Sequence, residues 1–488
     1  MQKPQIHNGN LELTYFFDKQ AEPTMLEETE TSKIGTSIKN KIWQIFPSAC
    51  ASLTCIPFGL MLGWPSPTYP TLIFAEDSPV PITLDQSAMI AGFLLLGVCF
   101  GTLFSTSSIA QGPKNGIIFG NLCIVLGWVL MWQSQNMYWL LASRFLMGSG
   151  HGYAMGQIKR YIIEMTEDAL SASLVKQTQF YALFGFVLAF AVGPFISFRL
   201  FALTSLILAT FILFLAIFLP STPRELIQAK KIRDAKKLLV FLKPDSNPDQ
   251  EIDKIRETDS NVKPVNDFGF MKIMRDNSLR VNFIKFTFIV ICQQYCGAPP
   301  TLVYTQIIFS RSNVPYPEYI ALGYAVLFFL SNLVGCYISP KYNKKTVLLV
   351  SSFSILLLFI LNILVIYFKV NEKYFSYTSV IVMYLFIIVY TTSLGSIPFT
   401  LINDWFPQNC RVFMTKFYIV MFSLLGLSIT KIFQVLIGQF PLYIPFCLFS
   451  AVIVFAIGFI SIFMSGGGNK HFYKTNIAEI VVGVEEKK

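Results

Sequence analysis

The chain has 488 residues, of which 53% are hydrophobic and only 14% are charged, and its formal net charge is +10. Water-soluble domains carry about 25% charged residues, and this chain has far fewer. Its high hydrophobic content excludes a largely disordered chain, and its length with only nine Cys excludes a small secreted disulfide scaffold. With only three His residues, the chain also offers little to metal or hydrolytic chemistry, and we predict no metal, no cofactor and no enzyme activity. The hydrophobic residues occur in long blocks, which predicts an integral membrane protein.

Twelve hydrophobic blocks are long enough to cross a bilayer. A helix needs about 20 such residues to cross the hydrocarbon core. Lipid offers no partners to backbone amides, so each block is expected to be an α-helix. The forty residues before the first block contain no hydrophobic segment typical of a cleavable signal peptide. The predicted spans are 43–64, 87–108, 116–133, 138–158, 178–198, 200–219, 282–308, 319–339, 346–368, 378–402, 413–437 and 442–464.

The spans form two sets of six, separated by one long polar segment. Within that segment, residues 224–243 have the pattern of an amphipathic helix, which either lies on the membrane surface or packs beneath the spans. The predicted fold is therefore all-α and integral to the membrane, with twelve transmembrane helices in two halves and a helical cytoplasmic loop. The predicted parts are a tail at 1–42, a six-helix half at 43–219, the loop at 220–281, a second half at 282–464 and a tail at 465–488.

Basic residues define the predicted orientation. Most of the 38 Lys and Arg residues fall in one alternating set of connecting segments, together with both tails. Such segments face the cytoplasm in membrane proteins. The sequence thus predicts two cytoplasmic termini, and the positive charge reflects topology and predicts no nucleic-acid partner. The other set of segments holds only Arg199, Arg311, Lys369 and Lys373.

The two halves carry matching polar segments. Glu164 follows the fourth span and stands seven residues before Ser171, while Asp404 follows the tenth span and stands seven residues before Arg411. Short basic turns also occur between the second and third spans of each half. Repeated halves around a binding site at the middle of the membrane are typical of secondary transporters.

Seven ordered motifs give the chain a recognisable resemblance. They are LGWPSPTYPTL after the first span, ASRFLMGSGHG and YIIEM in the fourth, PSTPRELIQAKKIRDAKKLLVFLK after the sixth, QQYCGAPPTLVYTQIIF in the seventh, and GSIPF with DWFPQNCR in the tenth. Over about residues 43–465 the chain resembles the sugar porter family of the major facilitator superfamily, and within it the insect trehalose and hexose facilitators. The resemblance implies the major facilitator fold and a sugar substrate carried by alternating access.

Amide side chains are the predicted solute contacts. An amide donates and accepts hydrogen bonds, as sugar hydroxyls do, and polar side chains inside a membrane generally face a cavity or a partner. By resemblance, Gln179, Gln293 and Gln294 hold the sugar, and Phe399 occupies the place of a Trp that stacks on it. Hydrogen bonding between helices is the alternative role for the amides.

The same resemblance assigns charged residues to gating. The family closes its cytoplasmic side with ion pairs, and the matching residues here are Arg144, Glu164, Asp404 and Arg411. Other charged positions of this latch are replaced by Ile109, Ser171 and Pro340. We therefore expect a weak latch and a protein that rests mainly open to the cytoplasm.

No Asp or Glu lies well inside any predicted span, and Met61 stands where proton-coupled relatives place a carboxylate. A span without a titrating carboxylate gives a proton nothing to couple to. The sequence thus predicts passive uniport of a sugar such as trehalose or a hexose across the plasma membrane. Two alternatives stay open: a non-transporting sensor or receptor, and a transporter of a non-sugar solute.

Overall fold

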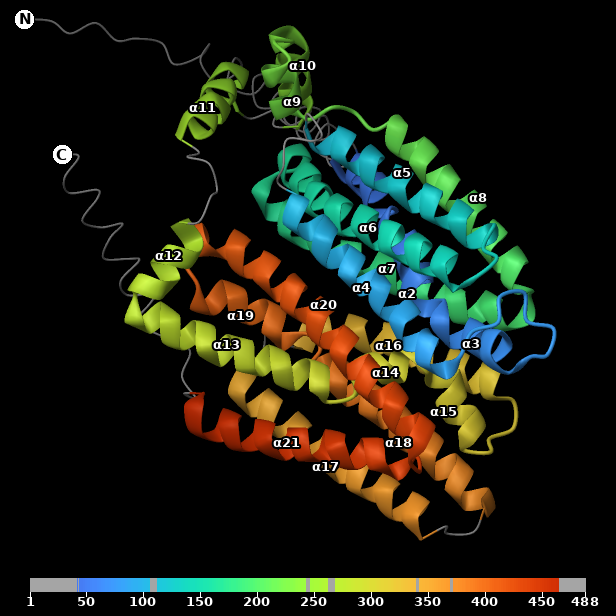
Figure 1. The fold of residues 1–488 in the computed structure, drawn as a ribbon. Helices are drawn as coiled ribbons and strands as arrows, with labels where there is room; N and C mark the ends of the chain where they lie inside the picture. The colour runs from blue at the N-terminus through green and yellow to red at the C-terminus, as the bar shows by residue number, and fades with distance from the viewer. Residues whose placement is uncertain are drawn as a thin grey trace, which may run out of the picture.

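The computed structural model describes residues 42, 44–105, 112–242, 246–261, 268–338, 342–368 and 372–464, and these residues form helices and turns without a strand. The two tails, apart from residue 42, and the latch positions Ile109 and Pro340 lie outside the described residues. Two bundles of helices lie side by side, with three short helices near one end of the first bundle (Figure 1). We call this the loop end and the other the far end.

The N-terminal bundle begins with one long span, Gln44–Phe74, which is interrupted near Thr54 and again at Trp64. Several of the following helices start at side-chain caps: Thr83 forms a capping box with Gln86, and Asn136 accepts from two backbone amides. The elements are α2 (Cys55–Gly63), α3 (Pro65–Phe74), α4 (Leu84–Phe104), α5 (Pro113–Trp132), α6 (Met137–Met165), α7 (Asp168–Val192), the 3-10 turn η1 (Gly193–Phe195) and α8 (Phe198–Ile217).

The connecting segment and the C-terminal bundle follow. The connecting helices are α9 (Pro223–Gln228), α10 (Ile232–Leu242), α11 (Pro248–Asn261) and α12 (Phe268–Arg275). The C-terminal bundle contains α13 (Asn277–Tyr295), α14 (Ala298–Val303), α15 (Thr305–Arg311), α16 (Pro317–Ile338), α17 (Lys344–Tyr367), α18 (Glu372–Thr392), α19 (Ile397–Trp405), α20 (Gln408–Gln439) and α21 (Tyr443–Phe463).

Ten helical segments in the described residues are long and hydrophobic enough to cross a membrane. The two other predicted spans correspond to α6 and α13, which are helical but more polar, because α6 carries Arg144 and Lys159 and α13 carries Gln293 and Gln294. Together they make the twelve predicted membrane helices.

The prediction of one uninterrupted seventh span at 282–308 is wrong. The chain breaks after α13 at Gly297, whose φ of +97° is a left-handed conformation that favours glycine. Pro299 and Pro300 then begin α14, and a second break at Tyr304 separates α14 from α15. The proline ring and the left-handed residue both interrupt the hydrogen-bond ladder of a helix.

The predicted amphipathic segment 224–243 is two helices, α9 and α10, separated by Lys230 with a φ of +61°. The hydrophobic faces of α9, α10 and α11 pack on one another through Ile227, Ala235, Leu239 and Ile252. Leu242 then joins a cluster that includes residues of α6, so these helices pack against the loop end of the first bundle.

Glycines allow the closest helix crossings in the first bundle. A Cβ atom at Gly97 would lie 2.2 Å from the carbonyl oxygen of Phe145, where α4 crosses α6. A Cβ atom at Gly59 would lie 1.8 Å from the carbonyl oxygen of Ala182, where α2 crosses α7. Small residues at such crossings let membrane helices gain contact in the absence of a hydrophobic driving force.

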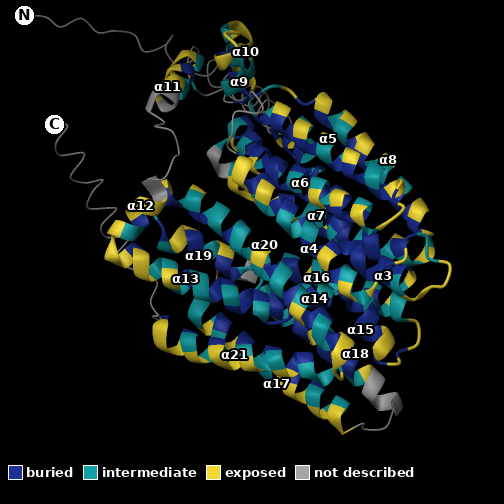
Figure 2. Ribbon diagram, in the orientation of Figure 1, coloured by how far each residue is buried: buried dark blue, intermediate teal, exposed yellow. Residues whose placement is uncertain are grey.

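Large hydrophobic side chains cover the outer faces of the bundles. Figure 2 shows exposed positions along α8, α17 and α21, whereas the positions between helices are buried. These exposed side chains are suited to contact with lipid, since they would be unfavourable in water. They include Ile207, Phe211, Phe214, Leu357, Val454 and Phe455.

Candidate solute-binding site

The two adjacent glutamines of α13 have different surroundings. Gln293 is buried, donates from its amide nitrogen to the carbonyl oxygen of Gly395 at 3.2 Å, and accepts from the hydroxyl of Tyr418 at 3.3 Å. Gln294 is fully buried, and neither its amide oxygen nor its amide nitrogen has a hydrogen-bond partner among the described residues. Adjacent residues of a helix point about 100° apart, which explains how one amide is satisfied and the other is not.

Gln294 lies where the two halves meet. A Cβ atom on Gly426 of α20 would be 3.4 Å from the amide oxygen of Gln294 and 3.1 Å from Leu95 of α4. Ser423 stands three residues before Gly426, on the same face of α20, and its buried hydroxyl also has no partner in the part of the chain that is described. Leaving a buried polar group unsatisfied costs about 1–3 kcal/mol, so these groups are suited to bind hydroxyls of a solute or water.

Gln179 takes part in a contact between helices. Its amide nitrogen donates to the side-chain oxygen of Asn332 on α16 at 3.3 Å, while the residue as a whole stays exposed. Asn332 in turn donates to the carbonyl oxygen of Phe328. Among the described residues, Gln179 thus shares no hydrogen bond with Gln293 or Gln294, and its partner comes from the opposite half.

Phe399 also lies between the halves. Its ring is 6.1 Å from the ring of Tyr418, and the ammonium of Lys159 on α6 lies 5.2 Å from its centroid. Phe399 is nevertheless 43% exposed. Phe399 thus contacts a residue of the opposite half and still keeps a large exposed surface. The predicted fourth span ends at residue 158, which would place Lys159 in a cytoplasmic segment, but α6 continues to Met165.

Arg144 is buried in the first half. One guanidinium nitrogen donates to the carbonyl oxygen of Met61 at 2.5 Å, and the group lies 4.9 Å from the centroid of Trp64. These contacts link α6 to the first span and to the start of α3. The carbonyl dipole and the aromatic face partly offset the free energy that is lost when the charge of Arg144 is removed from water.

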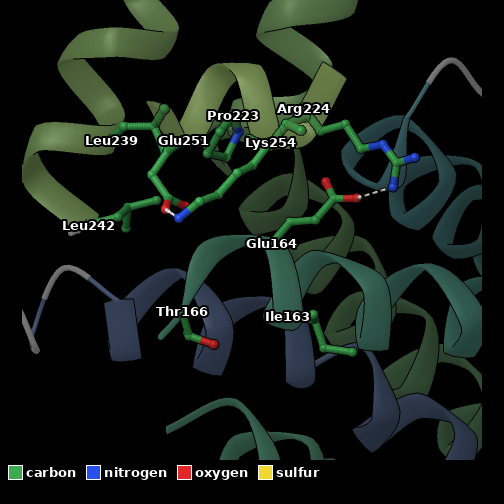
Figure 3. A pocket seen from close by; sticks show the side chains of 10 residues that line it. Ile163, Glu164, Thr166, Pro223, Arg224, Leu239, Leu242, Glu251 and Lys254 are labelled. Atoms are coloured by element: carbon green, nitrogen blue, oxygen red, sulfur yellow. Dashed lines mark hydrogen bonds and ion pairs between the residues drawn. The ribbon is translucent and has the colours of Figure 1, made fainter. Parts of the chain in front are cut away.

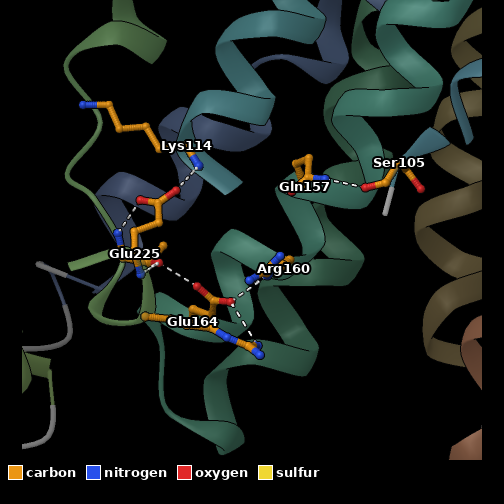
Figure 4. A network of polar contacts seen from close by, with 8 residues as sticks. Ser105, Lys114, Gln157, Arg160, Glu164 and Glu225 are labelled. Atoms are coloured by element: carbon orange, nitrogen blue, oxygen red, sulfur yellow. Dashed lines mark hydrogen bonds and ion pairs between the residues drawn. The ribbon is translucent and has the colours of Figure 1, made fainter. Parts of the chain in front are cut away.

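Glu164 is bound within the first half and its connecting segment. It accepts from Arg160 Nε at 2.8 Å and from the hydroxyl of Thr222 at 2.6 Å, and it lies 3.8 Å from a nitrogen of Arg224 (Figure 4). Asp404 pairs with Lys344 of α17, and Arg411 donates to the carbonyl oxygens of Asn403 and Phe406. Among the described residues, the contacts of each of these three gating candidates therefore lie within its own half or the connecting segment.

Glu225 connects two helix starts at the loop end. Its carboxylate accepts from the backbone amide of Thr222 at 2.9 Å and from that of Lys114 at 2.8 Å, at the start of α5 (Figure 4). Burial raises the pKa of Glu225, although the two backbone amides oppose this shift. Through this residue, α9 is fixed to α5.

At the far end the two halves are joined directly. The hydroxyls of Ser87 and Tyr304 lie 2.8 Å apart, and the backbone amide of Gln306 donates to the hydroxyl of Ser66 at 3.2 Å. Lys431 pairs with the carboxylate of Asp85. These contacts are made by α3, α4, α15 and α20, which Figure 1 shows converging at that end.

A cavity of about 210 Å³ lies at the loop end, between α6 and α9–α11 (Figure 3). Its walls carry both signs of charge, which pair with each other: Lys254 with Glu251 at 2.8 Å, and Arg224 with Glu164. The other walls are hydrophobic, from Ile163, Pro223, Leu239, Leu242 and Ile255. The predicted solute contacts do not line this cavity, so it is distinct from the candidate site.

Comparison with known proteins agrees with this architecture. The sequence family described as "Sugar (and other) transporter" matches residues 48–477. The chain is 24% identical to mouse solute carrier family 2, facilitated glucose transporter member 6, over 94% of both chains, and 23% identical to the facilitated trehalose transporter Tret1 of Apis mellifera ligustica, over 84% of both.

The fold is also that of a solved transporter. It matches the inward-open xylose transporter XylE from E. coli with a TM-score of 0.70 at 16% identity, over 87% of this chain and 97% of that one. The likeness confirms the predicted major facilitator architecture. The chain belongs to the sugar transporter family, a family of membrane transporters and not of enzymes.

Proposed function

We propose that this protein carries a sugar across the plasma membrane by passive uniport, with both termini in the cytoplasm and the loop end facing inward. The observation that carries this proposal is the buried, unpartnered amide of Gln294 beside the satisfied amide of Gln293. Together with Ser423, these groups offer donors and acceptors to sugar hydroxyls at the junction of the two halves.

Uniport is supported by the position of the acidic side chains. In the described parts of the spans, Asp85 starts α4, Glu164 stands at the end of α6, and Asp404 lies near the end of α19. Met61 is fully buried at the position where proton-coupled relatives have a carboxylate. The sugar gradient is then the driving force.

The deciding experiment is uptake of radiolabelled trehalose and glucose into vesicles that contain the purified protein. Saturable uptake that stops at the external concentration, at the same initial rate with and without a pH gradient between about pH 5.5 and 7.5, supports the proposal. Accumulation above the external concentration under that gradient contradicts uniport. If neither trehalose nor glucose, nor any further sugar or sugar acid added to the assay, moves faster than in protein-free vesicles, the sensor alternative is favoured.

A further inference from the structure

Lys159 is a cation at the contact between the two halves. It belongs to α6 of the first half, is half-buried, and directs its ammonium to the face of Phe399 on α19 of the second half. It therefore lies beside the exposed side chain of Phe399. Arg160, the next residue, points to Glu164 and does not share this position.

Two other lysines of the spanning helices have a carboxylate partner, which Lys159 lacks. Lys431 pairs with Asp85 and Lys344 pairs with Asp404. In the described part of the structure, no carboxylate pairs with Lys159, and its ammonium lies over the ring of Phe399. An aromatic face attracts an ammonium but carries no net charge, so the positive charge stays uncompensated.

A series of side-chain contacts also connects Lys159 to Gln293. The ring of Phe399, which it faces, is 6.1 Å from the ring of Tyr418, and the hydroxyl of Tyr418 donates to Gln293. This series of residues has hydrogen-bonding groups at one end, where Gln293 lies, and a single positive charge at the other. A cation inside a membrane protein that has no protein counter-ion is suited to a charged ligand.

We propose that the transported sugar carries one carboxylate, which pairs with Lys159 against the face of Phe399, while its hydroxyls bind Gln293 and Gln294. This inference rests on the proposed function and defines its substrate class. One cation matches the single charge of a hexuronate better than the higher charge of a sugar phosphate. Transport of such an anion by uniport moves net charge across the membrane.

The experiment compares three solutes in vesicles that contain the full-length protein: glucuronate, glucose and glucose 6-phosphate. We expect the parent protein to take up glucuronate with a half-saturation concentration at least tenfold below that of the other two. An inside-positive potential should speed glucuronate uptake and leave glucose uptake unchanged. Lys159→Gln should remove the preference for glucuronate over glucose, and Lys159→Arg should retain it.

Lys285→Gln is the matched control, since it removes a cation from α13 about 12 Å along the helix from Gln293. It should leave the preference unchanged. A parent protein that moves glucose as well as glucuronate, or prefers the phosphate, overturns the carboxylate assignment and leaves sugar transport standing. If none of the three moves faster than in protein-free vesicles, the proposed function itself fails. Should Lys159→Gln not reconstitute, the solute preference and the voltage response of the parent still decide.

Discussion

The hydroxyl of Tyr304 lies 2.8 Å from the hydroxyl of Ser87, and the two residues belong to opposite halves of the transporter. Tyr304 stands at the break between α14 and α15, and its ring also packs 5.8 Å from that of Tyr69. Contacts of this kind exist only while the far ends are together, so they stabilise the conformation in which the far end is closed.

Tyr304→Phe should loosen this closure. Loss of the hydroxyl pair removes about 0.5–1.5 kcal/mol from the closed far end, which shifts the population ratio about 2- to 12-fold toward the open form. The readout is the labelling rate of Ser66→Cys by a membrane-impermeant reagent applied from the far side, in a background without the native Cys residues.

The control for this change is Tyr367→Phe, since Tyr367 is exposed on the outside of the same half. It should leave the labelling rate unchanged. Equal rates in the parent, Tyr304→Phe and the control would show that the hydroxyl contact does not stabilise the closed form.

Gln294→Leu and Gln293→Leu should separate binding from stability. Gln293 loses two hydrogen bonds on substitution, so its variant should be less stable by about 1–3 kcal/mol. Gln294 loses none in the empty protein, so Gln294→Leu should be as stable as the parent or more stable. Both variants should raise the half-saturation concentration for the sugar several-fold, as measured by uptake, while thermal unfolding in detergent measures stability. An unchanged half-saturation concentration in both would remove the pair from the site.

Ser171→Arg should shift the protein away from the form that is open at the loop end. Ser171 lies in the first turn of α7, where the family's latch carries an Arg. An added ion pair contributing 1–3 kcal/mol would change the population ratio by about 5- to 150-fold. Labelling from the loop side of Met155→Cys, four residues before Lys159 on α6, should slow accordingly. A Cys that is already shielded in the parent, with no response to Ser171→Arg, would contradict the weak latch.

Glu225 should make stability depend on pH. Burial raises its pKa in the folded protein above its ordinary value near 4.3, so the folded state binds the proton more tightly than the unfolded state. Its favourable contribution is complete below about pH 4.3 and is lost as the pH rises through the raised value. The melting temperature of the parent minus that of Glu225→Gln should therefore fall as the pH is raised from about 4. A difference that increases with pH would mean that the backbone amides outweigh burial.

Gly97→Ala should destabilise the first half. The new methyl group would lie 2.2 Å from a backbone oxygen of α6, and separating the helices loses contacts along both, at a cost of about 1–3 kcal/mol or more. Gly458→Ala on α21 is the matched control, because no atom lies within 4 Å of a Cβ at that position. Gly97→Ala should lower the melting temperature relative to the parent, and Gly458→Ala should lower it less or raise it. Equal melting temperatures of the two variants would refute the close crossing.

Hydropathy and motif order predict the fold well, because twelve hydrophobic blocks leave few alternatives in lipid. Breaks inside a span are less visible, since hydropathy does not register φ angles. The seventh span shows this: Gly297, Pro299 and Pro300 are readable as helix-breaking residues, but the block stays hydrophobic through them.

The site is harder to predict because partners come from distant segments. Nothing near Gln179 in sequence indicates Asn332, 153 residues later, as its partner. A prediction from hydropathy ends the fourth span just before the charged Lys159 and so places this residue in a cytoplasmic segment. The helix in fact continues for six residues beyond it. Helical periodicity offers a signal for its position, because Lys159 lies on the same helix face as Met155, one turn earlier and inside the predicted span.

The break at Gly297 divides the seventh span into α13, before it, and the shorter helices α14 and α15, after it. The amides of Gln293 and Gln294 precede the break, while Tyr304 and Gln306, which close the far end, follow it. The groups that join the two halves at the far end and the amides of the candidate site therefore belong to separate segments of one span. Substitutions after Gly297 should then change the closure of the far end and leave the amides in place.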